Sequence, residues 1–353
     1  MGSISKKCVG LIFGGKSNEH FVSITSAEAI FRALNSKQNK KFFNLKTFYI
    51  SREGKWFSHE RSILILKNKL NIKELEIEEI YKPKNLIEIL NVKEIDVWFP
   101  ILHGFNGEDG TIQGLLKFTQ KPFISSGILG SAICMDKITS KLLFANLKIP
   151  QVNYLPLQNY DPNNTNELQN IIKKVNAKLN FPLFIKPSNS GSSLGISKIN
   201  HIKELPMALK KAWEIDKRII IEEGLNVREL ECGIIGKNNL HPSEVGEVEC
   251  KSEWYDYESK YELENKLTIP AFIDKNIRDQ IQAFAIKGCK ALNVEVFARV
   301  DFFLEKGTNK IYLNEINTIP GFTDKSMFPL LWKPLGLDID QLVAKLINIV
   351  IES

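Results

Sequence analysis

Cysteine is scarce in this 353-residue chain: there are five, widely scattered, and no two of them form a CxxC pair. An odd number of scattered cysteines argues against a disulfide framework and against a zinc site, and it favours a reducing compartment such as the cytoplasm. The sequence also lacks a hydrophobic run long enough to cross a membrane, and its N-terminus has too few apolar residues for a signal peptide. We therefore expect a cytoplasmic protein with no membrane partner.

A strong net charge is missing as well. The 47 Lys and Arg residues face 41 Asp and Glu residues, which gives +6, evenly spread along the chain. So small a surplus argues against a nucleic-acid partner but leaves room for an anionic small molecule. No internal repeat is found. With 43% hydrophobic residues, the chain is long enough for two or three globular domains.

Strands and helices alternate in residues 1–130, which we predict to form a first domain of α/β class. KCVGLIFGG is typical of a buried strand that ends in glycines, VSITSAEAIFRALN of a helix, and FNLKTFYIS and IDVWFPILHG of two further strands. Residues 60–94 are rich in Lys, Asn, Glu and Ile with weak periodicity. We interpret that segment as peripheral.

Residues 131–224 are predicted to form a small central α+β domain, with the strands FPLFIKPS and GISKI on either side of a Ser/Gly loop. Residues 225–353 hold the strands RELECGII and HPSEVGEVE, a long helix, a hairpin and a C-terminal helix. Between them, loop 247–266 contains WYDYESKYELENK, which is aromatic enough to close over a site and polar enough to open. It is a candidate lid, and the alternative is a solvated surface loop.

The hairpin near the C-terminus carries the most informative pattern. ARVDFFL and KIYLNEIN flank the turn signal EKGTNK, which predicts two antiparallel strands. If residue 305 pairs with residue 311, four polar side chains share one face: Arg299, Asp301, Glu315 and Asn317. Three oxygen ligands beside an arginine suit Mg²⁺ bound to phosphate oxygens, although a solvated hairpin face with a cross-strand pair is the alternative. A slip of one residue would move these groups to opposite faces.

Two glycine-rich loops are candidates for phosphate binding. In FPLFIKPSNSGSSLGISKI, Lys186 stands before a Ser/Gly loop whose amides and hydroxyls could wrap phosphate oxygens, and the alternative is a flexible hairpin turn. GLIFGGKS, Gly10 to Ser17, matches the P-loop pattern GxxxxGK[ST] letter for letter. However, Leu11 to Phe13 continue the strand, so only GGKSNEH remains as loop and a P-loop is disfavoured.

The residues after that first strand have a more natural use. Ser17 could cap the following helix, while Glu19 offers a carboxylate to an ammonium group or only to the helix N-terminus. LHGFNGEDGTIQG repeats the arrangement after a later strand, at the end of the sheet where α/β proteins bind ligands. Its alternative is a turn in which Asp109 caps TIQGLLKF and His103 is merely packed. The Pro-Gly of IPGF, residues 319–322, lets backbone N–H groups approach a ligand.

Seven motifs, in this order, resemble those of the D-alanine–D-alanine ligases of the ATP-grasp superfamily: GGKSNEHFVS, HGFNGEDGTIQG, MDKITSK, KPSNSGSSLG, YDYESKY, RVDFF and NEINTIPGFTDKSMFP. The resemblance implies a three-domain ATP-grasp architecture with an N-terminal Rossmann-like parallel sheet and a C-terminal antiparallel sheet. It also implies that ATP converts a first D-alanine to an acyl phosphate, which the amine of a second D-alanine attacks to give a peptidoglycan precursor. A homodimer and two Mg²⁺ ions, with Mn²⁺ as a possible substitute, are further expectations of the family.

The resemblance assigns a nucleotide site. The implied ATP contacts are Lys137, Lys186, Ser192, Ser193, Glu222, Glu223, Leu225, Glu229 and Lys260. Of these, the lysines would hold the phosphates, Glu222 and Glu229 would meet adenine and ribose, and Glu223 to Leu225 would offer backbone groups to the base. The implied metal ligands are Asp301, Glu315 and Asn317, which agrees with the face expected of the hairpin.

The resemblance also assigns a substrate site. Its implied members are Glu19, His103, Ser192, Tyr261, Arg299, Gly321, Ser326 and Met327. Glu19 would bind the first ammonium, with His103 nearby, while Ser326, followed by Met327, would meet the second carboxylate. Arg299 and the Gly321 N–H would stabilise the tetrahedral oxyanion, a role whose donors typically contribute about 2.7–4 kcal/mol each. Ser192 and Tyr261, with Glu19, would link the lid to the first-substrate site.

The sequence departs from the family at two positions near these motifs. Phe21 stands where an acidic residue is usual and Phe105 where proline is common, which puts local loop shape in doubt. Tyr261 is absent from relatives that use D-lactate as second substrate, so its presence favours D-alanine and excludes D-serine less firmly. A P-loop NTPase that uses Gly10 to Ser17 and a non-catalytic ATP-binding sensor are the alternatives from other classes.

Overall fold

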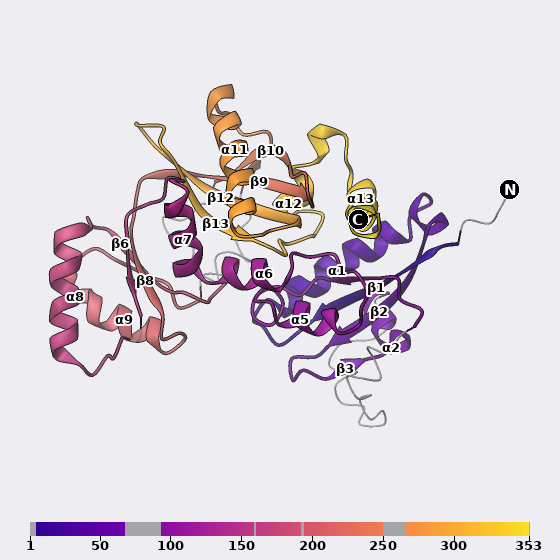
Figure 1. The fold of residues 1–353 in the computed structure, drawn as a ribbon, viewed down its shortest axis with the longest axis horizontal. Helices are drawn as coiled ribbons and strands as arrows, with labels where there is room; N and C mark the ends of the chain where they lie inside the picture. The colour runs from indigo at the N-terminus through magenta and orange to yellow at the C-terminus, as the bar shows by residue number, and fades with distance from the viewer. Residues whose placement is uncertain (1–4, 68–92, 159, 192–193, 250–265, 353) are drawn as a thin grey trace.

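The computed structural model describes residues 5–67, 93–158, 160–191, 194–249 and 266–352. Three sheets follow one another along the longest axis of the molecule (Figure 1). The N-terminal sheet and the central sheet lie at opposite ends, and the C-terminal sheet lies between them. This arrangement leaves one place where all three sheets contribute loops to a common cleft.

The N-terminal sheet has the strand order β3-β2-β1-β4, with β2 and β4 both parallel to β1. Strand β1 is buried along nearly its whole length, as expected of a parallel strand covered on both faces. Because Leu11 to Phe13 lie within β1, the glycine segment after it is too short for a P-loop, as predicted. The elements of this part are β1 (Lys7–Gly14), α1 (His20–Leu34), η1 (Asn39–Lys41), β2 (Phe43–Ile50), β3 (Trp56–Phe57), α2 (His59–Leu66), β4 (Val97–Pro100), α5 (Thr111–Lys117) and α6 (Ile128–Met135).

Ser17, the expected cap of the first helix, and Asp109, the cap in the alternative interpretation of its motif, are not the N-cap residues. The N-cap of α1 is Glu19 rather than Ser17, because the chain turns two residues later and the Ser17 hydroxyl accepts the Glu19 N–H at 3.2 Å. The N-cap of α5 is Gly110 rather than Asp109, whose carboxylate instead bonds to the N–H groups on either side of the turn, at 2.8 and 3.0 Å. Both side chains therefore shape the loop before the helix.

The segment expected to be peripheral, residues 60–94, is only partly so. Its beginning belongs to α2, and Ile65 and Leu66 of that helix are buried in the core of the N-terminal part. The helix packs against β2 and α1, and these two apolar side chains join the core there. Residues 68–92 lie outside the described residues.

The central sheet is antiparallel, with the order β5-β8-β6-β7. Val175 of α8 and Leu209 of α9 are buried with Ile185 and Ile221, so the two helices cover the same core. Helix α7 begins at Lys137 because the Asp136 side chain accepts the Thr139 N–H at 2.8 Å. The elements of this part are α7 (Lys137–Asn146), β5 (Tyr154–Leu157), α8 (Thr165–Lys178), β6 (Leu183–Pro187), β7 (Ser197–Ile199), η2 (Ile202–Glu204), α9 (Leu205–Trp213) and β8 (Ile219–Glu223).

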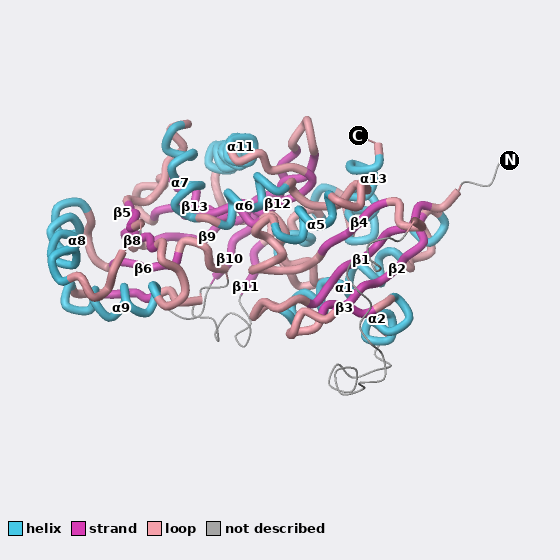
Figure 2. The backbone as a smooth tube through the Cα atoms, turned by 60° about the horizontal axis from the view of Figure 1, so that its bottom comes forward, coloured by secondary structure: helices cyan, strands magenta, loops and turns pink. Residues whose placement is uncertain are grey.

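The C-terminal sheet is antiparallel, with the order β11-β10-β9-β12-β13, and α11 covers one of its faces (Figure 2). Helix α13 contacts both α1 and the strands β9 and β12, so Leu346 and Ile347 share a core with Val9 and Leu11. The elements of this part are β9 (Val227–Gly236), β10 (His241–Glu249), β11 (Lys266–Thr268), α11 (Lys275–Ala291), β12 (Val296–Glu305), β13 (Ile311–Asn317), α12 (Met327–Leu330), η3 (Lys333–Leu335) and α13 (Ile339–Ile351).

The far end of the β12–β13 hairpin has the predicted register. Asp301 lies opposite Glu315, and Arg299 lies opposite Asn317. The residues between them, Val300 and Ile316, are buried on the other face of the sheet, against α11. Alternation along both strands therefore places the four polar side chains together, as the sequence predicts.

The turn of the same hairpin corrects the prediction. Ile311 pairs with Leu304 rather than Glu305, because the Glu305 N–H donates to the Lys310 carbonyl at 2.9 Å and closes the turn one position earlier. A β-bulge absorbs the difference, since Asn314 stands opposite no residue of β12. An extra residue of this kind disrupts the ladder locally and shifts the pairing beyond it. The slip of one residue thus occurs, and the bulge preserves the polar face.

Candidate active site

A cleft of about 410 Å³ opens where the three sheets meet, a size typical of small-molecule sites. Twelve of the predicted site residues line it: Glu19, His103, Lys137, Lys186, Glu229, Arg299, Asp301, Glu315, Asn317, Gly321, Ser326 and Met327. Three others, Glu222, Glu223 and Leu225, are described but are not part of the lining. Ser192, Ser193, Lys260, Tyr261 and most of loop 247–266 lie outside the described residues.

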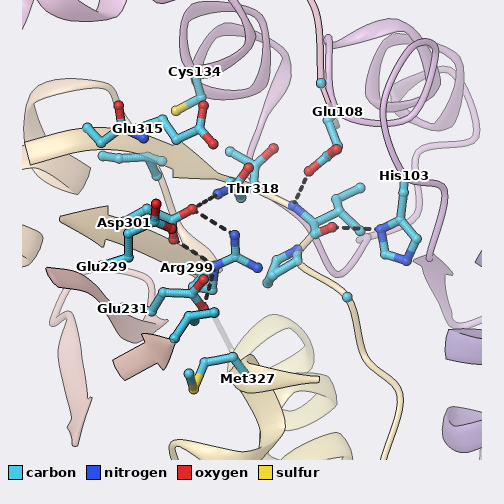
Figure 3. A pocket seen from close by; sticks show the side chains of 18 of the residues that line it. His103, Glu108, Cys134, Glu229, Glu231, Arg299, Asp301, Glu315, Thr318 and Met327 are labelled. Atoms are coloured by element: carbon cyan, nitrogen blue, oxygen red, sulfur yellow. Dashed lines mark hydrogen bonds and ion pairs between the residues drawn. The ribbon is translucent and has the colours of Figure 1, made fainter. Parts of the chain in front are cut away.

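One wall of the cleft is the polar face of the β12–β13 hairpin, whose side chains converge in Figure 3. We call Arg299, Asp301, Glu315 and Asn317, with Glu231 of β9, the hairpin cluster. Nε and Nη2 of Arg299 donate to the two carboxylate oxygens of Asp301, both at 2.7 Å, and Nε also lies 2.9 Å from Oε2 of Glu231. Burial alone would lower the pKa of Arg299, but Asp301 and Glu231 raise it well above its usual value. The guanidinium is therefore a fixed cation.

Glu231 is a site residue that the motifs do not reveal. Its strand, RELECGII, shows acids in alternation at Glu229 and Glu231, which was a visible signal. Only the pairing of β9 with β12 brings Glu231 opposite Asp301, and that pairing joins strands some 70 residues apart. The alternation within β9 shows that Glu229 and Glu231 lie on the same face of that strand. It does not show that this face also carries Arg299 and Asp301.

The hairpin cluster has donors that suit a Mg²⁺–phosphate complex. Asp301 and Glu315 stand directly opposite each other, and Nδ2 of Asn317 donates to Oδ2 of Asp301 at 2.9 Å. Over the described ranges, no group of three or more His, Cys, Asp or Glu side chains is placed to hold a metal ion by itself. Mg²⁺ keeps one or two carboxylates and takes its other ligands from phosphate and water. Two carboxylates and an amide therefore fit an ion that arrives with phosphate.

A second charged group surrounds Glu222 of β8. We call Lys141, Lys186 and Glu222 the lysine cluster. Nζ of Lys141 lies 2.8 Å from Oε1 of Glu222, and Nζ of Lys186 donates to the other oxygen, Oε2. Burial alone would raise the pKa of Glu222, but the two lysines lower it to about 2. Two cations on one carboxylate leave a net positive charge, and of the three side chains only Lys186 lines the cleft.

Helix α7 runs between the two clusters. Lys137, in its first turn, donates from Nζ to the Ser190 carbonyl at 2.5 Å and lies 3.8 Å from Oε2 of Glu315. Lys141 is one turn further along the same side of the helix and reaches Glu222 instead. One helix therefore supplies a lysine to the cleft and another to the protein interior behind it.

Glu222 and Glu223, which the resemblance places next to the adenine base, are both buried. Glu222 is only 2% exposed, and its carboxylate is bound by lysines. The Glu223 carboxylate accepts hydrogen bonds from Asn153 and Asn180 at 2.7 to 2.9 Å, and its peptide N–H donates to the Asn153 carbonyl at 3.0 Å. Glu229, by contrast, lines the cleft beside the hairpin cluster (Figure 3).

The N-terminal sheet contributes Glu19 and His103 to the cleft. Glu19 caps α1 without a side-chain capping bond, and a β-carbon on Gly104 would lie 2.5 Å from its Oε2. Gly104 has φ +70°, so only glycine lets the loop pass so close. His103 bonds through Nδ1 to the Ile319 carbonyl at 2.8 Å and through Nε2 to the Ser26 hydroxyl at 3.0 Å. Burial lowers the pKa of His103, so its ring is neutral near pH 7.

Glu108, in the same loop as His103, is a second cleft residue without a predicted role. Its carboxylate accepts the Gly104 N–H at 2.7 Å and the Ile319 N–H at 3.2 Å. Burial, and then the nearby Glu19, raise the pKa of Glu108 to about 8. Together, Glu108 and His103 hold the N–H and the C=O of Ile319, two residues before Gly321 (Figure 3).

The loop after β13 presents the last three predicted residues to the cleft. A β-carbon on Gly321 would lie 3.0 Å from the Ser326 hydroxyl, so the glycine permits this close approach. Ser326 is the N-cap residue of α12, and its hydroxyl accepts the Thr323 N–H at 3.0 Å. The Met327 sulfur packs against Gly246 of β10, where a β-carbon would lie 2.6 Å from it. A peptide group, a hydroxyl and an apolar side chain therefore meet in one short loop.

The fold and the site together define the ATP-grasp class of ligases, as the motifs predict. The defining features are a parallel N-terminal sheet, a small central α+β unit and a five-stranded antiparallel sheet, arranged around one charged cleft. Two family models match the chain: the D-ala D-ala ligase N-terminus over residues 8–126 and the D-ala D-ala ligase C-terminus over residues 143–348. The chain belongs to the D-alanine–D-alanine ligase family.

Curated relatives and solved structures agree with this assignment. D-alanine–D-alanine ligases of Prochlorococcus marinus are 59% identical, with 98% of both chains covered for strain MIT 9312 and 99% for strain MIT 9515. The VanG D-Ala:D-Ser ligase from Enterococcus faecalis has a TM-score of 0.84 at 34% identity, over 98% of this chain and 99% of that one. The D-alanine-D-alanine ligase from Coxiella burnetii has a TM-score of 0.81 at 28% identity, over 98% and 96%. None of the helices in the described ranges has the length and apolarity needed to span a membrane.

Proposed function

We propose that this chain uses ATP to join two D-alanine molecules into D-alanyl-D-alanine, a precursor of peptidoglycan. Family membership supports this activity, and so do Prochlorococcus relatives at 56 to 59% identity that are named D-alanine–D-alanine ligase. The observation that carries the proposal is the pairing of Asp301 with Glu315 and of Arg299 with Asn317 on the wall of the cleft. A solvated hairpin face does not require so many charged side chains that are largely withdrawn from water.

The nucleotide is proposed to lie between the central and C-terminal sheets. Its phosphates take their positive partners from Lys137 and Lys186, and Glu229 takes the ribose. The remaining ATP contacts proposed from the family are Ser192, Ser193, Glu222, Glu223, Leu225 and Lys260. Asp301, Glu315 and Asn317 would hold Mg²⁺ or Mn²⁺, which neutralises phosphate charge when bound.

The chemistry then proceeds in two displacements. Glu19 holds the ammonium of the first D-alanine, whose carboxylate oxygen attacks the γ-phosphorus, so that ADP leaves and an acyl phosphate forms. Ser326 and Met327 orient the second D-alanine, whose amine attacks the acyl carbon. Arg299 and the Gly321 N–H donate to the oxyanion, and its collapse expels phosphate and leaves the peptide bond.

The rest of the proposed site acts by position. His103 and Glu108 hold the Ile319 peptide and so fix the loop that carries Gly321. Ser192 and Tyr261, with Glu19, are proposed to link loop 247–266 to the first-substrate site, where closure keeps water from the acyl phosphate. Because the cleft holds both substrates side by side, the attack of the amine no longer requires two molecules to meet in solution, which lowers the entropic part of the barrier.

Phosphate release is the direct test. The purified protein should release phosphate with ATP, Mg²⁺ and D-alanine as sole amino acid, and L-alanine should give none. Release that does not distinguish the two isomers would overturn the substrate assignment, and no release with either would favour a non-catalytic ATP-binding sensor.

D-serine is the second candidate for the acceptor, because the VanG structure, named a D-Ala:D-Ser ligase, matches with a TM-score of 0.84. Mass spectrometry of products from an equimolar mixture of D-alanine, D-serine and D-lactate decides between them. The proposal predicts D-alanyl-D-alanine as the main product. A main product that contains serine or lactate would reassign the enzyme within its family.

Three further proposals follow from the family. We propose a cytoplasmic homodimer and domains over residues 1–130, 131–224 and 225–353. The P-loop alternative is tested by comparing ATP affinity in Lys186→Ala and Lys16→Ala, because only a P-loop enzyme would lose more affinity in the second. The oligomeric state is tested by sedimentation of the full chain.

A further inference from the structure

Among the described residues, Lys141 is the only lysine that is buried, at 1% exposure. Its Nζ lies 2.8 Å from Oε1 of Glu222 and 5.4 Å from the centre of the Tyr154 ring. It lines neither the cleft nor another cavity of the described residues, which lies between the N-terminal part and α13. No step of the proposed reaction uses it. The charge of Lys141 therefore acts on Glu222, the carboxylate that it contacts.

Lys186 holds the other oxygen of the same carboxylate but differs in its access to the cleft. Its side chain is 13% exposed and lines the cleft, whereas Lys141 lies behind it. When Lys186 shares its charge with a phosphate, it gives Glu222 less compensation. A carboxylate that is only 2% exposed cannot replace that loss with water. A second cation must therefore remain on it.

We propose that Lys141 is a positioning residue for ATP binding, the permanent counter-ion of Glu222 that leaves Lys186 free to hold the phosphates. This inference rests on the proposed function, because it assumes that Lys186 contacts ATP. With Lys141 in place, Glu222 stays ionised and in position while Lys186 turns to the nucleotide. Without Lys141, Lys186 becomes the sole partner of a buried carboxylate and is held back from the phosphates.

The substitution Lys141→Met tests the role, because it keeps an unbranched side chain and removes only the charge. The KM for ATP should rise at least about 30-fold, since truncating one partner of a buried charge pair has effects of that size. The KM for D-alanine and the kcat at saturating ATP should stay within about threefold, because Lys141 touches no reacting group. A general loss of structure would move all three quantities.

Lys287→Met is the matched control. Lys287 lies on α11, and its Nζ donates to the Leu147 carbonyl, the C-cap of α7, at 2.8 Å. This variant removes a lysine that contacts the same helix as Lys141 but leaves Glu222 and its two partners unchanged. Its KM for ATP should equal that of the wild type.

The decisive comparison is made in the background of Glu222→Gln, which removes the charge that Lys141 compensates. There, adding Lys141→Met should change the KM for ATP by less than about threefold, because the two residues act as one unit. A folded Lys141→Met single variant with the wild-type KM would overturn the inference. An increase of 30-fold in the Glu222→Gln background would overturn it as well, and this comparison holds even if the single variant does not fold. Absence of D-alanine-dependent phosphate release in the wild type would instead reject the proposed function.

Discussion

The two charged clusters of the cleft differ in the sign of their surplus charge. In the hairpin cluster, one cation, Arg299, is surrounded by the carboxylates of Glu231, Asp301 and Glu315. In the lysine cluster, two lysines share the single carboxylate of Glu222. The hairpin cluster should therefore attract a cation, and the lysine cluster an anion. A metal–polyphosphate complex has both kinds of charge and needs both walls.

The opposite surplus charges of the hairpin cluster and the lysine cluster do not fully neutralise each other across the cleft. Lys137 lies 3.8 Å from Glu315, so one contact already joins the two walls. On each wall a further charged side chain holds the surplus: Glu231, which lines the cleft, pairs with Arg299, and Lys141, which does not line it, pairs with Glu222. Each wall thus has a second counter-ion: Glu231 remains on Arg299 when a ligand binds Asp301, and Lys141 remains on Glu222 when a ligand binds Lys186. Variants on the two walls should respond to different ligands.

Arg299→Met should have the largest effect on the hairpin wall. Loss of an oxyanion donor lowers kcat by about 10²- to 10³-fold, and the variant also leaves Asp301 and Glu231 without their cation. The kcat of D-alanine-dependent phosphate release measures the effect, with Arg278→Met as control because Arg278 pairs with Glu244 at 3.7 Å outside the cleft. A kcat within threefold of the wild type would remove Arg299 from the reaction.

Asp301→Asn and Lys186→Met should separate the two walls. The first keeps the shape of a proposed metal ligand and should raise the half-saturating Mg²⁺ concentration about 10- to 100-fold. The second should raise the KM for ATP at saturating Mg²⁺ while the Mg²⁺ requirement changes less. Titrations of both ligands in both variants make the comparison. If each variant shifts the two ligands equally, the walls have no separate roles.

Glu108→Gln should change how stability depends on pH. The folded-state pKa of Glu108, about 8, is raised above the unfolded value of about 4.3, so its contribution to stability is full below about pH 4.3, falls as the pH rises and is gone above about pH 8. Between about pH 5.5 and pH 8, the wild type should lose roughly 3 kcal/mol of unfolding free energy relative to the variant. Urea denaturation of both proteins at the two pH values measures this. An equal difference at both values would show that Glu108 does not titrate in that window.

Arg32→Met should have the smallest effect. Arg32 of α1 pairs with Asp324 at 2.5 Å, next to the loop that carries Gly321 and Ser326, but both side chains are more than half exposed. Exposed ion pairs contribute less than about 1 kcal/mol, because water and salt screen them. Thermal unfolding and kcat should both be close to wild type. A large loss of kcat would mean that this surface contact, rather than the bonds of His103 and Glu108 to Ile319, fixes the loop.

The sequence predicts the polar face of the hairpin better than its turn. Alternation predicts which residues of each strand share a face, and the expected register adds that Asp301 lies opposite Glu315, as it does in the structure. The turn was misplaced by one residue because the Glu305–Lys310 bond and the bulge at Asn314 have no signature in EKGTNK or LNEIN. The polar face was preserved only because these two irregularities compensate each other.

Lys141 and Glu231 show what a local pattern cannot supply. A lysine one turn after Lys137 on a helix is typical of a solvated face, and its burial follows from the packing of α7 against β8, which is far away in the sequence. Glu231 acquires its partner only when β9 pairs with β12. Both residues depend on contacts between distant elements, so their roles appear only in three dimensions. The motifs predict the groups that would contact ligands, and the fold shows which side chains pair with those groups.

A crystal structure with Mn²⁺ and a non-hydrolysable ATP analogue tests the division of the cleft most directly. We expect anomalous peaks for manganese between Asp301, Glu315 and Asn317, with Nζ of Lys186 on the phosphates and Nζ of Lys141 still on Glu222. A nucleotide bound outside the cleft would contradict this division. So would phosphates that contact neither Lys186 nor a manganese ion held by the hairpin cluster.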